Sequence, residues 1–500
     1  MKFAYLLFLI ILVPPSVGFC QETIDGTKSL FHRSDVELKG RLRHLVLEEL
    51  APGTGVSRKK IVTVERQGKY PDWSVRLSTW SIHPEPTRES DVTLPADAVF
   101  FGFAPLEGPD SKVLVLIRQR QLEVWTPEGA TFVKAPPLSV PIDTSFSVAE
   151  LGEVTPIQLL SPLNDGKGIT RLLIPTPKGI REYLLDKTHL RAGDLYGVMP
   201  RMFYHSEIER QPFDLPFWVR NSVWYPAAIL GNLTTSTREL LWPWMDEVDV
   251  VPLDQKSAVR TLRFNQMTEA ERDDAQSYVV TVPEDLDGDG RTDFLVNKFQ
   301  GAATALRAQT TLFFTDSNGN APEKGLVLKP PGNRAAGALS IDINKDNRKD
   351  LAVASSQFNA WAIVRALIQH RVNVTFSLYL ARPDGYKLDH PDFEREISFR
   401  FNLEDAEIEG LLPTLEGDFN GDGYVDALYA RDRRQLSILI QKPNSKDLLP
   451  SSPSGTYDIA VPRQFRIGDL NGDGKSDIVL FDRRSSGNQR FTVLVNNGRL

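Results

Sequence analysis

The sequence contains four copies of one acidic nonapeptide, and a short apolar run follows each copy. The copies read DLDGDGRTD, DINKDNRKD, DFNGDGYVD and DLNGDGKSD, and they occupy loop 1 (285–293), loop 2 (342–350), loop 3 (418–426) and loop 4 (469–477). Carboxylates this close repel one another unless a cation lies between them, and calcium prefers hard oxygen ligands at alternate positions. Glycine at position 6 allows the sharp turn that brings position 9 toward the cation. The pattern therefore predicts four structural calcium sites.

The candidate calcium ligands are the side chains at positions 1, 3, 5 and 9 and the main-chain carbonyl at position 7. They are Asp285, Asp287, Asp289, Arg291 and Asp293; Asp342, Asn344, Asp346, Arg348 and Asp350; Asp418, Asn420, Asp422, Tyr424 and Asp426; and Asp469, Asn471, Asp473, Lys475 and Asp477. In loop 2, Asn347 replaces the glycine at position 6. Asparagine tolerates a left-handed backbone better than most residues, so we expect the same turn there. A single copy could instead be a solvated turn that binds no cation. The presence of four copies favours calcium binding.

The residues after each loop predict a strand and exclude an EF-hand. An EF-hand needs a glutamate at position 12 and a following helix. Position 12 is instead Val296, Val353, Tyr429 or Leu480, and the runs after position 9 read FLV, LAVAS, ALYA and IVLF. These runs have the length and the apolar character of buried strands. Each loop should therefore join one strand to the next, which also excludes a dockerin.

The spacing of the loops predicts an all-β fold, a β-propeller of about seven four-stranded blades with calcium loops in the last four. Units of this size without alternating helices indicate radial β repetition. The strand–turn–strand pattern recurs without the acids at 100–129, 159–179 and 227–242, and six or eight blades remain alternatives. Apolar residues at helical spacing predict a short helical insertion near 357–371.

The last repeat unit is incomplete, and this predicts how the N-terminal part of the chain contributes to the propeller. The last unit ends after about three strands, so we expect an N-terminal segment such as 42–50 to supply the missing strand, whereas strands at 61–65 and 73–82 have no assigned blade. The predicted organisation has four parts. They are a signal peptide (1–20), N-terminal strands that partly close the propeller (21–95), degenerate blades (96–280) and calcium-binding blades (281–500).

The first residues have the features of a secretory signal. Lys2 precedes an apolar run at 3–13 that is too short to span a bilayer, and small residues follow near Gly18. Cys20 is the one cysteine of the sequence. Lipoprotein anchoring at Cys20 is an alternative, which the bulky Phe19 disfavours. We expect a secreted, periplasmic or cell-surface protein without a transmembrane segment.

The segment GDLNGDGKSDIVLF, followed by FTVLVNNG, resembles the FG-GAP/VCBS repeat of β-propellers of the integrin α N-terminal type. The resemblance is specific over 280–500 and weak over 95–245. It implies that each calcium loop lies between adjacent strands of a blade and that the earlier blades hold no metal. It also implies binding or cell adhesion much more often than catalysis, without identifying the ligand.

Composition and motifs narrow the function further. The formal net charge is −7, and the thirteen aspartates of the four loops account for this acidity. The sequence has no basic stripe of the kind that predicts nucleic-acid binding. No catalytic motif is present, so we predict a protein that is not an enzyme and that binds a protein or glycan. A carbohydrate-active enzyme and a structural component of the cell envelope are the alternatives. Aromatic residues between 196 and 244 form a candidate binding face or pack between blades, and the acidic turn at 246–249 is expected to be solvated.

Overall fold

The computed structural model describes most of the chain, and it divides the chain into two compact units. The described residues are 30–50, 59–68, 74–106, 112–142, 154–157, 169–176, 178–198, 203–209, 218–224, 228–234, 237–253, 258–272, 277–300, 307–328, 335–356, 368–402, 407–443, 445, 448–462, 464–482 and 489–498. Unit 1 comprises 229–463 with 1–31 and 496–500, and unit 2 comprises 32–228 with 464–495.

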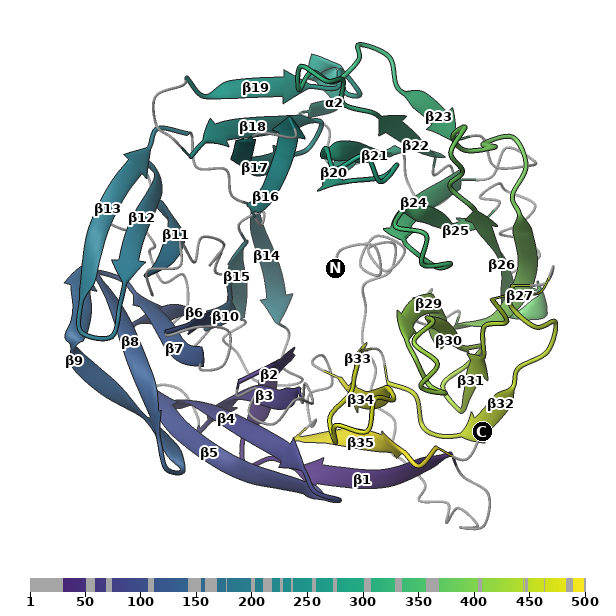
Figure 1. The fold of residues 1–500 in the computed structure, drawn as a ribbon. Helices are drawn as coiled ribbons and strands as arrows, with labels where there is room; N and C mark the ends of the chain where they lie inside the picture. The colour runs from purple at the N-terminus through teal and green to yellow at the C-terminus, as the bar shows by residue number, and fades with distance from the viewer. Residues whose placement is uncertain are drawn as a thin grey trace. The chain divides into compact units, whose positions relative to one another are not determined.

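Unit 1 contains four sheets, and in each of them strands that are consecutive in sequence pair antiparallel (Figure 1). The first sheet contains β16 (Ile229–Thr234), β17 (Thr237–Trp244), β18 (Glu247–Pro252) and β19 (Arg260–Arg263), and the helix α2 (Glu269–Arg272) follows it. The second contains β20 (Ser277–Glu284), β21 (Asp293–Gln300), β22 (Arg307–Phe313) and β23 (Leu326–Leu328). The third contains β24 (Ala335–Ile341), β25 (Asp350–Ser356), β26 (Arg371–Tyr379), β27 (Phe393–Asn402) and β28 (Glu407–Ile408). The fourth contains β29 (Leu411–Gly417), β30 (Asp426–Ala430), β31 (Gln435–Leu439) and β32 (Gly455–Asp458).

Unit 2 contains four larger sheets and one hairpin. The first sheet contains β2 (Arg41–Glu48), β3 (Lys60–Gln67), β4 (Ser74–Ile82) and β5 (Pro86–Leu94). The second contains β6 (Ala98–Pro105), β7 (Lys112–Arg118), β8 (Gln121–Glu128), β9 (Thr131–Pro141) and β10 (Thr155–Pro156). The third contains β11 (Thr170–Thr176), β12 (Gly179–Leu185) and β13 (Leu190–Tyr196), and the hairpin contains β14 (Phe203–Glu209) and β15 (Trp218–Trp224). The last sheet contains β1 (Phe31–Glu37), β35 (Arg490–Asn496), β34 (Asp477–Phe481) and β33 (Gln464–Gly468) in that spatial order.

The middle strands of these sheets are buried on both faces. All residues of β30 and β34 are buried, whereas residues of the outer strand β32 alternate between half-buried and exposed. A sheet with two apolar faces must be covered on both, so neighbouring sheets within each unit stack face to face. One apolar cluster, for example, combines residues of the sheets β24–β28 and β29–β32. This is the packing of propeller blades.

The number of blades differs from the expectation. Among the described residues, eight sheets have three to five strands, rather than the predicted seven blades. The additional blade is the sheet β2–β5, which includes the strands at 61–65 and 73–82 that had no assigned position. Its turns lack the acidic nonapeptide, so no sequence marker distinguishes it.

An N-terminal strand does complete the last blade, but it is not the expected one. The segment 42–50 overlaps β2 and pairs with β3, whereas β1 lies beside β35. Val36 and Leu38 pack in one apolar cluster with Val479 and Val493, and the main-chain N–H of Leu38 donates to the carbonyl of Gln489. The outer strand of the last blade is therefore residues 31–37.

Other expectations fall partly or wholly outside the described residues. The signal-peptide region lies outside them, as do residues 357–367 of the expected helical insertion. Arg371, at the end of that insertion, is the first residue of β26. Among the residues that the structure describes, no helix is both long and apolar enough to cross a membrane.

Candidate metal centre

Each acidic loop connects the first and second strands of one blade. Loop 1 joins β20 to β21, loop 2 joins β24 to β25, and loop 3 joins β29 to β30, all in unit 1. Loop 4 joins β33 to β34 in unit 2. In all four, the aspartate at position 9 is the first residue of the second strand. The prediction that the loops join strand to strand is thus confirmed.

Two residues of each loop adopt a left-handed backbone. The residues at positions 4 and 6 have positive φ angles between 61° and 85° in every copy. In loops 1, 3 and 4 both positions are glycine, whereas loop 2 has Lys345 (φ 61°) and Asn347 (φ 64°). The expectation that Asn347 preserves the turn is confirmed, and Lys345 adopts a conformation that costs most residues about 1–2 kcal/mol.

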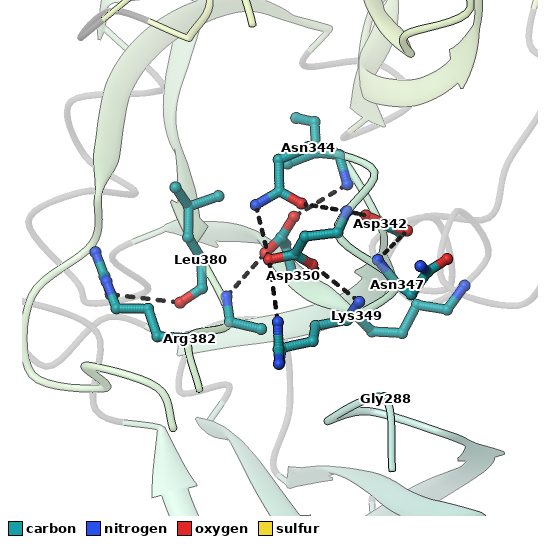
Figure 2. A network of polar contacts seen from close by, with 12 residues as sticks. Gly288, Asp342, Asn344, Asn347, Lys349, Asp350, Leu380 and Arg382 are labelled. Carbon is teal, nitrogen blue, oxygen red and sulfur yellow. Dashed lines mark hydrogen bonds and ion pairs between the residues drawn. The ribbon is translucent and has the colours of Figure 1, made fainter. Parts of the chain in front are cut away.

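The aspartate at position 1 organises the turn in every copy. Its two carboxylate oxygens accept hydrogen bonds from two main-chain N–H groups, one of which belongs to position 6, over distances of 2.6–3.1 Å. Carboxylates that accept several main-chain N–H groups are held in one orientation. Figure 2 shows this arrangement in loop 2, where Asp342, Asn344, Asn347 and Asp350 lie close together.

Positions 3 and 5 add a second set of repeated hydrogen bonds. The side-chain oxygen at position 3 accepts from the N–H of position 5 at 3.0–3.1 Å. The carboxylate at position 5 accepts from the N–H of position 7 at 2.8–2.9 Å. Both side chains therefore point into the turn, in the same way in all four loops.

The aspartate at position 9 is the most buried ligand. Asp293, Asp350, Asp426 and Asp477 are at most 1 % exposed. One oxygen of each accepts from the N–H of the apolar residue at position 2, at 2.7–3.1 Å. In loops 1 to 3 the other oxygen accepts from a main-chain N–H just after the third strand of the blade, at 2.8–2.9 Å. Position 9 thus ties the loop to the interior of its own blade.

Burial of these carboxylates raises their pKa values. The pKa of Asp293 is raised to about 7, chiefly by desolvation and to a smaller extent by the neighbouring carboxylates of Asp287 and Asp289. Desolvation likewise raises the pKa values of Asp350 and Asp426 to about 6. A cation among these carboxylates would oppose both effects, because it stabilises their charged forms.

The donor set fits a hard cation. Ligand oxygens of Asp285, Asp287 and Asp289 all lie within 4.8 Å of one another. Every candidate side-chain ligand is an aspartate or an asparagine, which is oxygen chemistry that suits calcium. The residues present therefore fit calcium.

The loops differ in the charges around them. The guanidinium of Arg291 pairs with Asp289 in loop 1, and that of Arg348 lies 3.8 Å from Asp346 in loop 2. In loop 3 position 7 is Tyr424, and the ammonium of Lys345 from loop 2 lies 4.6 Å from the centre of its ring. The four sites are therefore alike in backbone but not in their counter-charges.

Neighbouring loops of unit 1 are joined through the carbonyl at position 2. The carbonyl of Leu286 accepts from the N–H of Lys349 at 2.9 Å and from the hydroxyl of Tyr386 at 3.2 Å. The carbonyl of Ile343 accepts from the side-chain amide of Gln441 at 2.9 Å. Likewise, the carbonyl of Phe419 accepts from Asn496 at 2.8 Å.

Sequence reasoning missed these joining residues. The apolar residue at position 2 is visible in every copy of the nonapeptide, and its periodic recurrence could have indicated a shared role. Tyr386, Gln441 and Asn496 have no such signal, because they are three different residue types far from the carbonyls they reach.

The other candidate sites are described in part. Tyr196 and Trp242 are buried, at 5 % and 1 % exposed, which agrees with packing rather than a binding face. The side chains between 199 and 227 lie outside the described residues. The acidic turn is not solvated: Asp246 and Asp249 are buried, and Asp246 pairs with Arg272 at 2.8 Å.

Comparison of the sequence with known families adds one match. Residues 418–480, which contain loops 3 and 4, match the FG-GAP-like repeat. Residues 418–480 are therefore similar to the FG-GAP-like repeat, and the blade-like sheets define the class of the protein as a β-propeller. No sequence relative was found among curated proteins.

Several solved structures are similar at low identity. The biofilm matrix protein Bap1 of V. cholerae is 12% identical, with a TM-score of 0.32, and the match covers 94% of this chain and 90% of Bap1. AofleA from Arthrobotrys oligospora is 12% identical, with a TM-score of 0.25, and the match covers 74% of this chain and 92% of AofleA. The Tc holotoxin pore of Photorhabdus luminescens is 8% identical, with a TM-score of 0.21, and the match covers 92% of this chain and 27% of the holotoxin chain. All three TM-scores are too low to support an inference about function.

Proposed function

We propose that the protein is an exported β-propeller that calcium stabilises and that binds a protein or glycan ligand outside the cytoplasm. The observation that supports the proposal most strongly is the fourfold repetition of one loop geometry, with a buried aspartate at position 9 in each copy. Four buried carboxylates, each beside other carboxylates, destabilise a fold unless a cation compensates them. Calcium supplies that charge, and the side chains at positions 1, 3, 5 and 9 would hold it.

Calcium in these loops has a structural role in the proposal. The ligand sets contain no histidine, and their carboxylates would be occupied in holding the cation. A ligand that binds the folded state alone stabilises it by mass action. At tenfold excess over the dissociation constant each site contributes about 1.4 kcal/mol, so four sites contribute on the order of 5 kcal/mol. That is comparable with the whole stability of a modest domain.

The test of the calcium sites is thermal unfolding with calcium and with EDTA. We expect calcium to raise the unfolding midpoint of the full chain, and Asp473→Asn to remove about a quarter of the calcium-dependent stabilisation. Asp316→Asn is the matched control. Asp316 also accepts main-chain hydrogen bonds in an exposed turn, but it lies outside the nonapeptides. Equal midpoints in calcium and EDTA would refute the calcium sites.

The binding role requires a separate measurement. The purified protein is screened against glycans, polysaccharides and extracts of the cell envelope, each with and without calcium. The proposal predicts saturable binding that chelation weakens, without chemical change of the ligand. If shortened polysaccharide products were detected, the protein would be an enzyme and the proposed binding role would be wrong.

A further inference from the structure

The blades that contain loops 2 and 3 share a continuous chain of hydrogen bonds between two candidate ligands. Asp350, at position 9 of loop 2, accepts from the N–H of Ile343 at 3.0 Å. The carbonyl of Ile343 accepts from the side-chain amide of Gln441 at 2.9 Å. The main-chain N–H of Gln441 donates to Asp426, at position 9 of loop 3, at 2.9 Å. Three hydrogen bonds therefore connect the carboxylates of two separate sites.

Gln441 occupies a buried position in this chain. Its exposed fraction is 2 %, and Asp350 and Asp426 are fully buried. Water does not reach these groups to replace a lost bond, so the orientation of each depends on the next. Gln441 lies two residues after the end of β31; its main-chain N–H bonds to loop 3 and its side-chain amide bonds to loop 2.

We propose that Gln441 is a positioning residue that couples cation binding at loop 2 to cation binding at loop 3. This inference rests on the proposed calcium sites. A cation that binds loop 2 fixes Asp350 and Ile343, and so it fixes the side chain of Gln441. Loop 3 then pays less ordering entropy when it binds its own cation. By linkage the coupling is reciprocal.

A second contact also joins loops 2 and 3, and its effect on calcium binding must be distinguished from that of Gln441. The ammonium of Lys345 in loop 2 lies 4.6 Å from the ring centre of Tyr424 in loop 3. Charge changes in loop 2 also act on loop 3 directly through space. Neither effect requires the side chain of Gln441, so a double-mutant cycle that includes Gln441 isolates its part.

The experiment measures calcium binding at loop 3 by hydrogen exchange of the full chain. The readout is the calcium concentration that gives half-maximal protection of peptides within 411–430. Asp346→Asn weakens loop 2 and leaves loop 3 intact. In the protein with Gln441 we expect Asp346→Asn to raise the loop 3 midpoint about fivefold or more. In the Gln441→Met background we expect a rise below about twofold.

Controls distinguish this inference from the calcium proposal. Asp289→Asn makes the same change in loop 1, which, among the described residues, hydrogen bonds link to loop 2 and only through loop 2 to loop 3, and it should leave the loop 3 midpoint within about twofold. If Gln441→Met does not fold, Gln441→Asn replaces it, because the shorter amide does not reach Ile343. Equal effects of Asp346→Asn in both backgrounds, or no effect in either, would overturn the coupling. Absence of calcium protection in any loop would instead refute the calcium sites themselves.

Discussion

Two glycines of loop 1 differ in what surrounds them, although their backbones are alike. Gly288 and Gly290 have φ angles of 78° and 85°. A Cβ at Gly290 would meet nothing within 4 Å, whereas one at Gly288 would lie 2.7 Å from the main-chain oxygen of Asn347 in loop 2. We expect Gly290→Ala to lower the free energy of unfolding by about 1 kcal/mol through backbone strain. Gly288→Ala should cost more than about 2 kcal/mol, because loop 2 must also move.

Urea denaturation in calcium checks this pair. Gly290→Ala is the control, since it introduces the same strain without the collision. Equal losses from the two substitutions would mean that loops 1 and 2 are not in contact in solution.

A buried carboxylate outside the acidic nonapeptides predicts a pH dependence of stability. Glu123 on β8 is fully buried; desolvation alone would raise its pKa, but hydrogen bonds from Lys134, Arg118 and Trp125 outweigh it and lower the pKa below the ordinary 4.5. The folded state therefore binds fewer protons here than the unfolded state. The stabilisation is complete above about pH 4.5 and is lost as the pH falls through the lower folded pKa.

Glu123→Gln tests this dependence. The substitution should destabilise the protein by about 2 kcal/mol at pH 7. The destabilisation should shrink as the pH falls below about 4.5, because the unfolded state then binds a proton that the folded carboxylate does not. Urea midpoints between pH 3 and 7 give the difference between the two proteins. A difference that does not shrink on acidification would contradict the assignment.

At the scale of elements, the outer strand β1 should contribute to stability out of proportion to its length. Val36 is 9 % exposed and packs against the last blade, whereas Val133 on β9 is 39 % exposed. We expect Val36→Ala to lower the free energy of unfolding by about 2 kcal/mol. Val133→Ala, the same change on an outer strand, should stay within about 0.5 kcal/mol. Thermal unfolding of both variants tests this, and equal losses of stability would mean that β1 does not pack against β35.

The elements that sequence predicts well are those with a local marker. The nonapeptide identifies the loops because ligand chemistry fixes its spacing, and the buried strand after it is apolar on both faces, as β30 and β34 show. The sheet β2–β5 has no such marker, and its outer strand β5 is largely polar. Long-range contacts are harder still: Gln441 and Ile343 are separated by 98 positions. Their pairing depends on the stacking of blades, which no local pattern records.

At the scale of the whole molecule, calcium should protect the two units unequally. Unit 1 contains loops 1 to 3, and unit 2 contains loop 4 alone. In hydrogen exchange under native conditions we expect calcium to slow exchange in β21, β25, β30 and β34. Exchange in β7 and β12, whose blades have no acidic loop, should change much less. Uniform slowing across all strands would show that calcium acts only on global unfolding.

The pairing of β1 with β35 has a consequence for synthesis. During translation the first strand emerges long before its neighbour, which ends at Asn496. Until then β1 exposes an open edge and the apolar side of Val36, and such an edge readily pairs with other chains. A ribosome-bound chain must therefore keep this segment away from foreign strands until residues 490–496 have been synthesised. Molecules that terminate before residue 490 should aggregate through their N-terminal strand.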